Sequence, residues 1–159
     1  MSTGPAPTSL RKRQALYLGL LAVQTVCATI LVFELMPFFW RLVDDFGKVQ
    51  EVSGKGEALA CFCVVIFQAC YWWRINNLAV PFATKSQPIS HLIVFVGRLS
   101  FLFAGTLASL IFFRHMPALA PSNLTLSSAL KLLLLFAVLF SWFCFSLELE
   151  RLGKHQAQA

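Results

Sequence analysis

Four long apolar stretches alternate with shorter polar segments along this chain. A helix that crosses the apolar core of a bilayer, which is roughly 30 Å thick, needs about 20 residues. The second stretch is shorter than the others, so we expect residues at its ends to extend it. The pattern predicts transmembrane helices at about residues 14–40, 58–75, 91–113 and 129–150.

The first stretch follows a basic cluster, Arg11, Lys12 and Arg13, as the apolar part of a signal peptide would. It is longer than the apolar region of a signal peptide, and no Ala-x-Ala cleavage motif follows it. We therefore expect this stretch to be retained as a membrane span. The predicted organisation is a flexible N-terminal tail over 1–10, one four-span domain over 11–155 and a C-terminal tail over 156–159.

The composition argues against a soluble domain. Of the 159 residues, 58% are hydrophobic and 13% are charged, and the mean hydropathy is +0.72. A soluble domain of this length needs a larger polar surface than these residues provide. Within lipid, the backbone must satisfy its own hydrogen bonds, which helices do. The predicted fold class is all-α: an integral membrane bundle of four transmembrane helices in antiparallel, up-down topology.

The distribution of Lys and Arg predicts the orientation, because cytoplasmic segments carry an excess of basic residues. Seven basic residues lie on the side of the termini and five on the other side. Both termini are therefore predicted to be cytoplasmic. The expected location is the bacterial inner membrane, with a eukaryotic endomembrane as the alternative. The seven residues are Arg11, Lys12, Arg13, Arg74, Lys85, Arg151 and Lys154, and the five are Arg41, Lys48, Lys55, Arg114 and Lys131.

The formal net charge of +6 does not indicate a nucleic-acid partner. A nucleic-acid interface needs basic residues gathered in a patch or stripe, whereas here they are scattered over the ends of the spans. The expected partners are membrane lipids and other integral membrane subunits.

The sequence contains no set of residues with catalytic or metal-binding spacing. All five cysteines lie in apolar stretches, which is typical of small buried side chains rather than of a disulfide framework. His91 and His115 fall at opposite ends of the third span and His155 in the tail, so they cannot converge on a metal near its middle. We predict that the protein is not an enzyme and has no catalytic residue, metal or cofactor.

Arg98 lies deep within the third predicted span, where an isolated cation costs several kcal/mol. By helical rise, Arg98 is about 24 Å from Arg114 at the outer end, and Glu148 is about 25 Å from Lys131 in the next span. These matched depths predict an ion pair between Arg98 and Glu148. The alternatives are that Arg98 extends alone to the inner headgroups, or that it binds a substrate or lipid.

Small residues in the third span predict a surface for close helix packing. We expect this surface to pack within the molecule. Two glutamines inside the first and second spans, Gln24 and Gln68, are expected to form hydrogen bonds between helices. The predicted packing face consists of Ala104, Gly105, Ala108 and Ser109.

An apolar stripe follows the first span and alternates with charged residues at helical spacing. Either the first helix continues beyond the lipid, or a short helix lies on the membrane surface. The stripe either covers the end of its own bundle or provides a docking face for a partner. Its residues are Leu42, Val43, Phe46 and Val49.

The absence of catalytic motifs, the abundance of Phe and the small-residue face favour a non-catalytic accessory subunit. Such a subunit packs against, stabilises or regulates a larger membrane protein complex. The alternative is a small homo-oligomeric transporter or channel, in which Arg98 lines a path for an anion or a lipid headgroup.

Overall fold

A computed structural model of the chain describes residues 7–44, 54–78, 80, 86–115 and 125–157. These residues form four helices: α1 (Pro7–Asp44), α2 (Gly54–Asn77), α3 (Gln87–His115) and α4 (Leu126–Ala157). Each helix contains a segment long and apolar enough to cross a membrane. The all-α prediction is confirmed, and the chain has the features of a multi-pass membrane protein.

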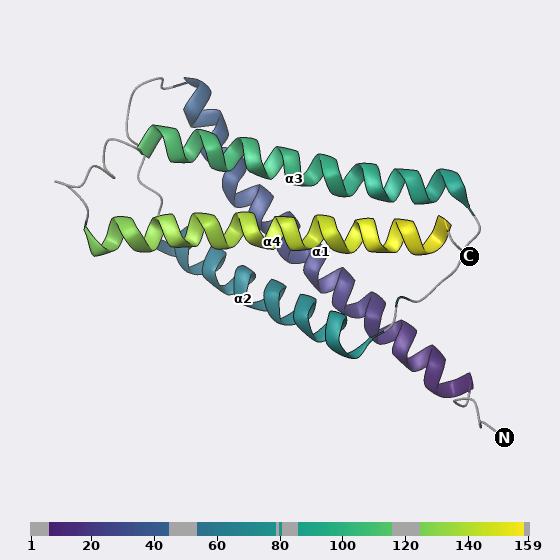
Figure 1. Cartoon of the computed structure of the whole chain (residues 1–159). Helices are drawn as coiled ribbons and strands as arrows, with labels where there is room; N and C mark the ends of the chain where they lie inside the picture. The colour runs from purple at the N-terminus through teal and green to yellow at the C-terminus, as the bar shows by residue number, and fades with distance from the viewer. Residues whose placement is uncertain (1–6, 45–53, 79, 81–85, 116–124, 158–159) are drawn as a thin grey trace.

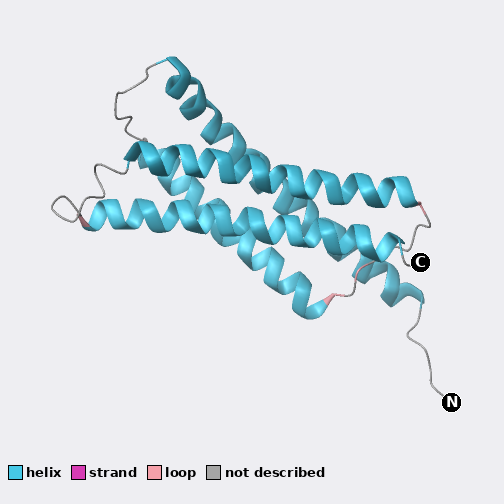
Figure 2. Cartoon of the chain, turned by 45° about the horizontal axis from the view of Figure 1, so that its top comes forward, coloured by secondary structure: helices cyan, strands magenta, loops and turns pink. Residues whose placement is uncertain are grey.

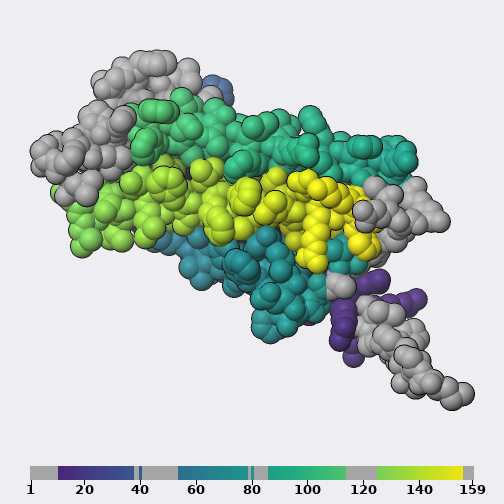
Figure 3. Space-filling model, in the orientation of Figure 1, coloured from purple at the N-terminus to yellow at the C-terminus, as the bar shows by residue number. Residues whose placement is uncertain are grey.

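The four helices run in alternating directions, so the two ends of the chain lie at the same end of the molecule (Figure 1). We call this the termini end and the opposite one the loop end. α1 crosses the other helices obliquely in both views (Figures 1 and 2). α3 packs most extensively along α4, followed by α1 with α2 and then α2 with α4. The space-filling view shows α3 and α4 side by side along their length, with α2 against the other side of α4 (Figure 3).

The helix boundaries extend beyond the predicted spans for identifiable reasons. α1 begins at Pro7, inside the expected tail, because proline is well suited to the first helical turn, where its missing N–H costs nothing. The same helix continues to Asp44. This agrees with the alternative in which the first helix extends beyond its predicted span. α4 begins after Thr125, whose Oγ1 accepts a hydrogen bond from the Ser128 N–H at 3.2 Å and so caps the helix.

The core lies between α1, α2 and α4, where aromatic and small side chains interlock. Phe67 of α2 meets Phe145 of α4 edge to face with ring centroids 6.0 Å apart, and Trp142 meets the same ring at 6.0 Å. Such edge-to-face pairs stabilise beyond the area they bury. Large apolar side chains also cover the outside, for example Phe33 of α1, which is 72% exposed. An apolar exterior of this kind is typical of a surface covered by lipid or by other apolar helices.

Two glycines, Gly97 of α3 and Gly153 of α4, allow these helices to approach closely. A Cβ at Gly153 would lie 2.5 Å from Val94 Cγ2 and 2.9 Å from the Ser90 carbonyl oxygen, and one at Gly97 would lie 3.0 Å from Leu149 Cβ. The Ser90 hydroxyl also donates a hydrogen bond to the Gly153 carbonyl at 2.6 Å. Small residues and a hydrogen bond across the contact are the usual means of helix association in lipid.

The predicted packing face of α3 divides into two parts. Ala104 is buried in the core and Ala108 is half-buried, so these two residues do face inward. Gly105 has no atom within 4 Å of an added Cβ, and Ser109 is exposed. The division arises because neighbouring residues on a helix are about 100° apart. The close α3–α4 contact lies nearer the termini end, at Gly97.

Candidate functional site

The main polar feature of the described interior is a cluster of four side chains near the termini end. Arg74 comes from α2, Glu148 from α4, and Tyr17 and Gln24 from α1. Arg74, Tyr17 and Gln24 are 0% exposed and Glu148 is 1% exposed. Lys, Arg, Asp and Glu are almost never buried to this degree unless paired. We call these four residues the buried ion-pair cluster.

Each member of the buried ion-pair cluster contacts Arg74 or Glu148 directly. Arg74 Nε lies 3.2 Å from Glu148 Oε1, and Arg74 Nη2 donates a hydrogen bond to Gln24 Oε1 at 2.6 Å. The Tyr17 hydroxyl donates to the same Glu148 oxygen. The Tyr17 ring also faces the guanidinium, whose carbon is 5.0 Å from the ring centroid, a cation–π contact. The cluster thereby ties α1, α2 and α4 together.

Arg74 turns inward, although it lies only three residues before the end of α2, because it shares a helix face with Phe67, Cys70 and Tyr71, which are all buried. The Cα–Cβ bond of a helical residue also tilts toward the helix N-terminus. α2 runs toward the termini end (Figure 1), so along the helix axis the Arg74 side chain leans toward the middle of the bundle rather than toward the headgroups. From the sequence, Arg74 was expected only among the basic residues that set the orientation, and its burial was not predicted.

The predicted ion pair between Arg98 and Glu148 is not formed. Glu148 pairs with Arg74, and Arg98 lies on the surface, 65% exposed, with its Nη2 3.5 Å from Glu150 Oε1. The predicted depth was nearly right, since Glu150 is only two residues beyond Glu148. However, two residues rotate a side chain by about 200° around a helix axis. Glu148 therefore faces α1 and α2, whereas Glu150 faces α3.

Arg98 leans in the opposite sense to Arg74, because α3 starts at the termini end and its side chains tilt toward that start (Figure 1). The exposed guanidinium is thus directed toward the end of the bundle. Of the three expectations for Arg98, pairing with Glu148 is wrong. Extension to the inner headgroups and binding of a substrate or lipid both stay predictions.

A second set of polar contacts continues the polar interior toward the middle of the bundle. Gln68 Nε2 of α2 donates a hydrogen bond to Ser141 Oγ of α4 at 3.1 Å and lies 4.0 Å from Cys144 Sγ. The Ser141 hydroxyl in turn donates to the Ala137 carbonyl of its own helix at 2.8 Å. The prediction that Gln24 and Gln68 form hydrogen bonds between helices is confirmed.

Tyr17 and Glu148 share a sequence signal that could have identified this site. On α1, Gln24 follows Tyr17 by seven residues, and on α4 Glu148 follows Ser141 by the same interval. A spacing of seven residues is two helical turns, so each pair lies on one face of its helix. Polar residues at this spacing in an otherwise apolar span mark the face that turns to other helices.

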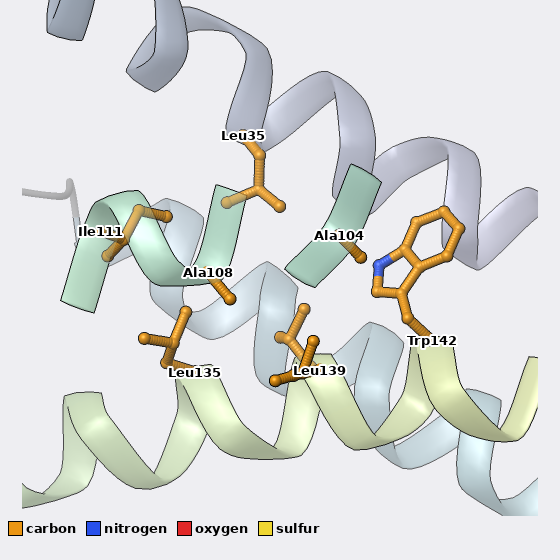
Figure 4. A pocket seen from close by; sticks show the side chains of 8 residues that line it. Leu35, Ala104, Ala108, Ile111, Leu135, Leu139 and Trp142 are labelled. Carbon is orange, nitrogen blue, oxygen red and sulfur yellow. The ribbon is translucent and has the colours of Figure 1, made fainter. Parts of the chain in front are cut away.

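A small, shallow apolar cleft lies between α1, α3 and α4. The cleft exists because Ala104 and Ala108 have small side chains that do not fill it (Figure 4). The Trp142 indole faces Ala104 in the same view. The lining contains no charged residue, and Arg98 does not contribute to it. Its residues are Leu35, Ala104, Ala108, Ile111, Leu135, Val138, Leu139 and Trp142.

The cysteines and the acidic residues do not gather into a metal site within the described ranges. There, no group of three or more His, Cys, Asp and Glu side chains could hold an ion. The five cysteines are free thiols; Cys61 is exposed and the other four are buried. The interpretation of the cysteines as structural residues stays a prediction.

The predicted docking stripe falls only partly within the described residues. Leu42 and Val43 belong to the last turn of α1, but nothing is established about the placement of their side chains. Phe46 and Val49 lie outside the described residues. The docking role of the stripe therefore stays a prediction.

Comparison with known protein families, curated proteins and solved structures finds no match for this chain. The described part of the chain has four helices that are each long and apolar enough to cross a membrane, as in a multi-pass membrane protein, and an ion pair buried between two of them, α2 and α4.

Proposed function

We propose that this chain is a non-catalytic accessory subunit that packs against, stabilises or regulates a larger membrane protein complex. The observation that carries this proposal is the exposure of α3. Only 17% of the residues in its apolar segment are buried, against 28–33% in the other helices. α3 packs chiefly along α4, so most of its perimeter is available to another membrane helix.

The exposed side of α3 includes positions where a second helix can approach closely. A side chain at Gly105 would meet nothing within 4 Å, and Ser109, four residues later, is exposed. Gly and Ser at this spacing allow two backbones to come close and provide a hydrogen-bonding hydroxyl. This part of the predicted packing face is therefore available for contact between proteins.

The use of the interior polar groups also supports a structural role. Arg74 and Glu148 neutralise one another, and Tyr17 and Gln24 bind to them. A guanidinium does not release its proton in proteins, so this arrangement holds helices together rather than transferring protons through Arg74. The Tyr17 hydroxyl donates to Glu148, and this hydrogen bond joins α1 to α4 within the interior.

The second candidate is the homo-oligomeric transporter or channel. The exposed cation at Arg98 favours it, since intramembrane ionisable residues often mark transport pathways. Because Arg98 faces outward, it would line a path only between copies of the chain. This candidate therefore requires an oligomer with Arg98 at the subunit interface.

We further propose that both termini face the cytoplasm of a bacterium, with the chain in its inner membrane. The described basic residues support this orientation, because Arg11, Lys12, Arg13, Arg151 and Lys154 lie near the termini end, while Lys55 and Lys131 lie near the loop end. Maleimide labelling of a cysteine introduced at Ser2 tests it after replacement of the exposed Cys61. Labelling from outside intact cells would reverse the orientation.

The test of the accessory role is solubilisation of the native membrane in a mild detergent, followed by identification of the co-purifying chains. Gly105→Leu should reduce the amount of an unrelated membrane protein that co-purifies. Gly19→Leu is the matched control, since an added Cβ at Gly19 of α1 also meets nothing within 4 Å. Recovery of copies of this chain alone would contradict the proposal and favour the transporter candidate.

A further inference from the structure

A second group of charged side chains lies on the outside of the α3–α4 pair near the termini end. Arg98 of α3 and Lys154 of α4 are 65% and 68% exposed, and Glu150 of α4, 24% exposed, lies between them. The same oxygen, Glu150 Oε1, is 3.5 Å from Arg98 Nη2 and 2.8 Å from Lys154 Nζ. One carboxylate therefore holds two cations close to each other.

The charges in this group do not balance. Lys154 makes the shorter contact with Glu150, while the 3.5 Å contact of Arg98 is too long for a strong hydrogen bond. Glu148 cannot compensate, because it is buried against Arg74. Because the Arg98 side chain is 65% exposed, most of the five N–H donors of its guanidinium are accessible to a ligand. The group carries a net positive charge and can accept an anion.

The surroundings of Arg98 identify the kind of anion. Arg98 lies eleven residues into α3, about 16 Å from the start of the helix. Exposed apolar side chains flank it on the same helix: Phe95 is 60% exposed, Leu99 52% and Leu102 65%. These side chains favour apolar surroundings such as acyl chains, while the guanidinium leans toward the headgroups. An anion bound here is therefore in contact with the apolar part of the membrane.

We propose that Arg98 and Lys154 form a binding site for the phosphodiester group of an anionic phospholipid. The planar fork of Arg98 suits two phosphate oxygens, and Lys154 adds a point charge from the neighbouring helix. The acyl chains of the same lipid cover Phe95, Leu99 and Leu102. A zwitterionic lipid binds less well, since its own ammonium group is repelled by the two cations. Glu150 keeps the two cations near each other.

The site is tested with the purified full-length chain and defined lipids, by native mass spectrometry. We expect phosphatidylglycerol to bind more tightly than phosphatidylcholine of the same acyl chains. A basic residue near an anionic lipid surface typically changes affinity about five-fold, so Arg98→Gln and Lys154→Gln should each weaken phosphatidylglycerol binding by about that factor. Arg98→Lys, which keeps the charge but loses the fork, should weaken it less.

The matched control is Lys55→Gln, which removes the same charge from an exposed position at the loop end. Equal losses for Lys55→Gln and Lys154→Gln would show a general attraction and overturn the site. Equal binding of the two lipids by the unaltered chain would overturn it as well. Inorganic phosphate that displaces the lipid at similar concentration would assign the cations to a soluble anion instead. Because Arg98 and Lys154 are exposed, their substitution should leave the thermal stability without lipid unchanged.

Discussion

The buried pair of Arg74 and Glu148 makes a quantitative prediction about stability. Arg74→Leu and Glu148→Leu each leave the other charge inside the bundle without its main partner. Breaking a buried ion pair by removing one partner typically costs about 3–5 kcal/mol. Both side chains are almost completely buried, so we expect losses in this range from each single variant.

The double variant Arg74→Leu/Glu148→Leu should lose much less than the sum of the two single losses. It contains no uncompensated charge, but the Tyr17 hydroxyl and the Gln24 carbonyl oxygen lose the partners they have in the cluster. Leaving a buried polar group unsatisfied costs about 1–3 kcal/mol. The expected loss is therefore about 2–6 kcal/mol, against about 6–10 kcal/mol if the single losses added. Adding Tyr17→Phe should recover part of the remainder.

Thiol exposure provides a suitable assay, because Cys63 and Cys144 are 1% and 2% exposed and react only after the helices separate. Unfolding in detergent is followed with a maleimide dye in a Cys61→Ser background. A loss of 1 kcal/mol lowers the midpoint by about 2–4 °C for a chain of this length, so each single variant should shift it by roughly 6 °C or more.

The matched control is the cycle of Arg98→Leu and Glu150→Leu. It removes an ion pair between an arginine and a glutamate on two helices, but Arg98 is exposed. Exposed pairs contribute little, so this cycle should show no measurable coupling. Additive losses in the Arg74 and Glu148 cycle, or equal coupling in both cycles, would refute the reasoning that burial makes the first pair strong.

Three further predictions concern the remaining contacts. Gly153→Leu should lower the thermal midpoint, since an added Cβ would lie 2.9 Å from the Ser90 carbonyl oxygen and disrupt the α3–α4 contact. Gly105→Leu should leave the midpoint nearly unchanged, and equal midpoints for the two variants would contradict the close approach of α3 and α4 at Gly153. Thr125→Ala should destabilise α4 by about 1 kcal/mol through loss of its cap, measured by chemical denaturation, and rescue by Thr125→Ser would confirm the capping role. Gln68→Leu should cost about 1 kcal/mol, because it removes the hydrogen bond to Ser141, and no change in the thiol-exposure midpoint would argue against that bond.

The four helices of the described residues could be predicted from the sequence alone. Four apolar stretches long enough to cross a bilayer leave helices as the structure that satisfies the backbone within each segment. The same reasoning identified Gln24 and Gln68 as residues that join helices, because an amide in an apolar span gains from a partner on another helix. These features depend on local composition and length, which are visible in a single sequence.

Which charges pair with one another depends on how the helices are rotated and arranged in space. Helical rise predicted the depth of Arg98 to within about 3 Å, the length of two residues, but rotation about the helix axis separates Glu148 from Glu150 by about 200°. Arg74, near the end of its span, is buried because it continues the face of α2 that carries the buried Phe67, Cys70 and Tyr71. The seven-residue spacing of Ser90, Gly97 and Ala104 is present in the sequence. The spacing shows that these residues share one face of α3, but only the position of α4 shows which helix packs against that face.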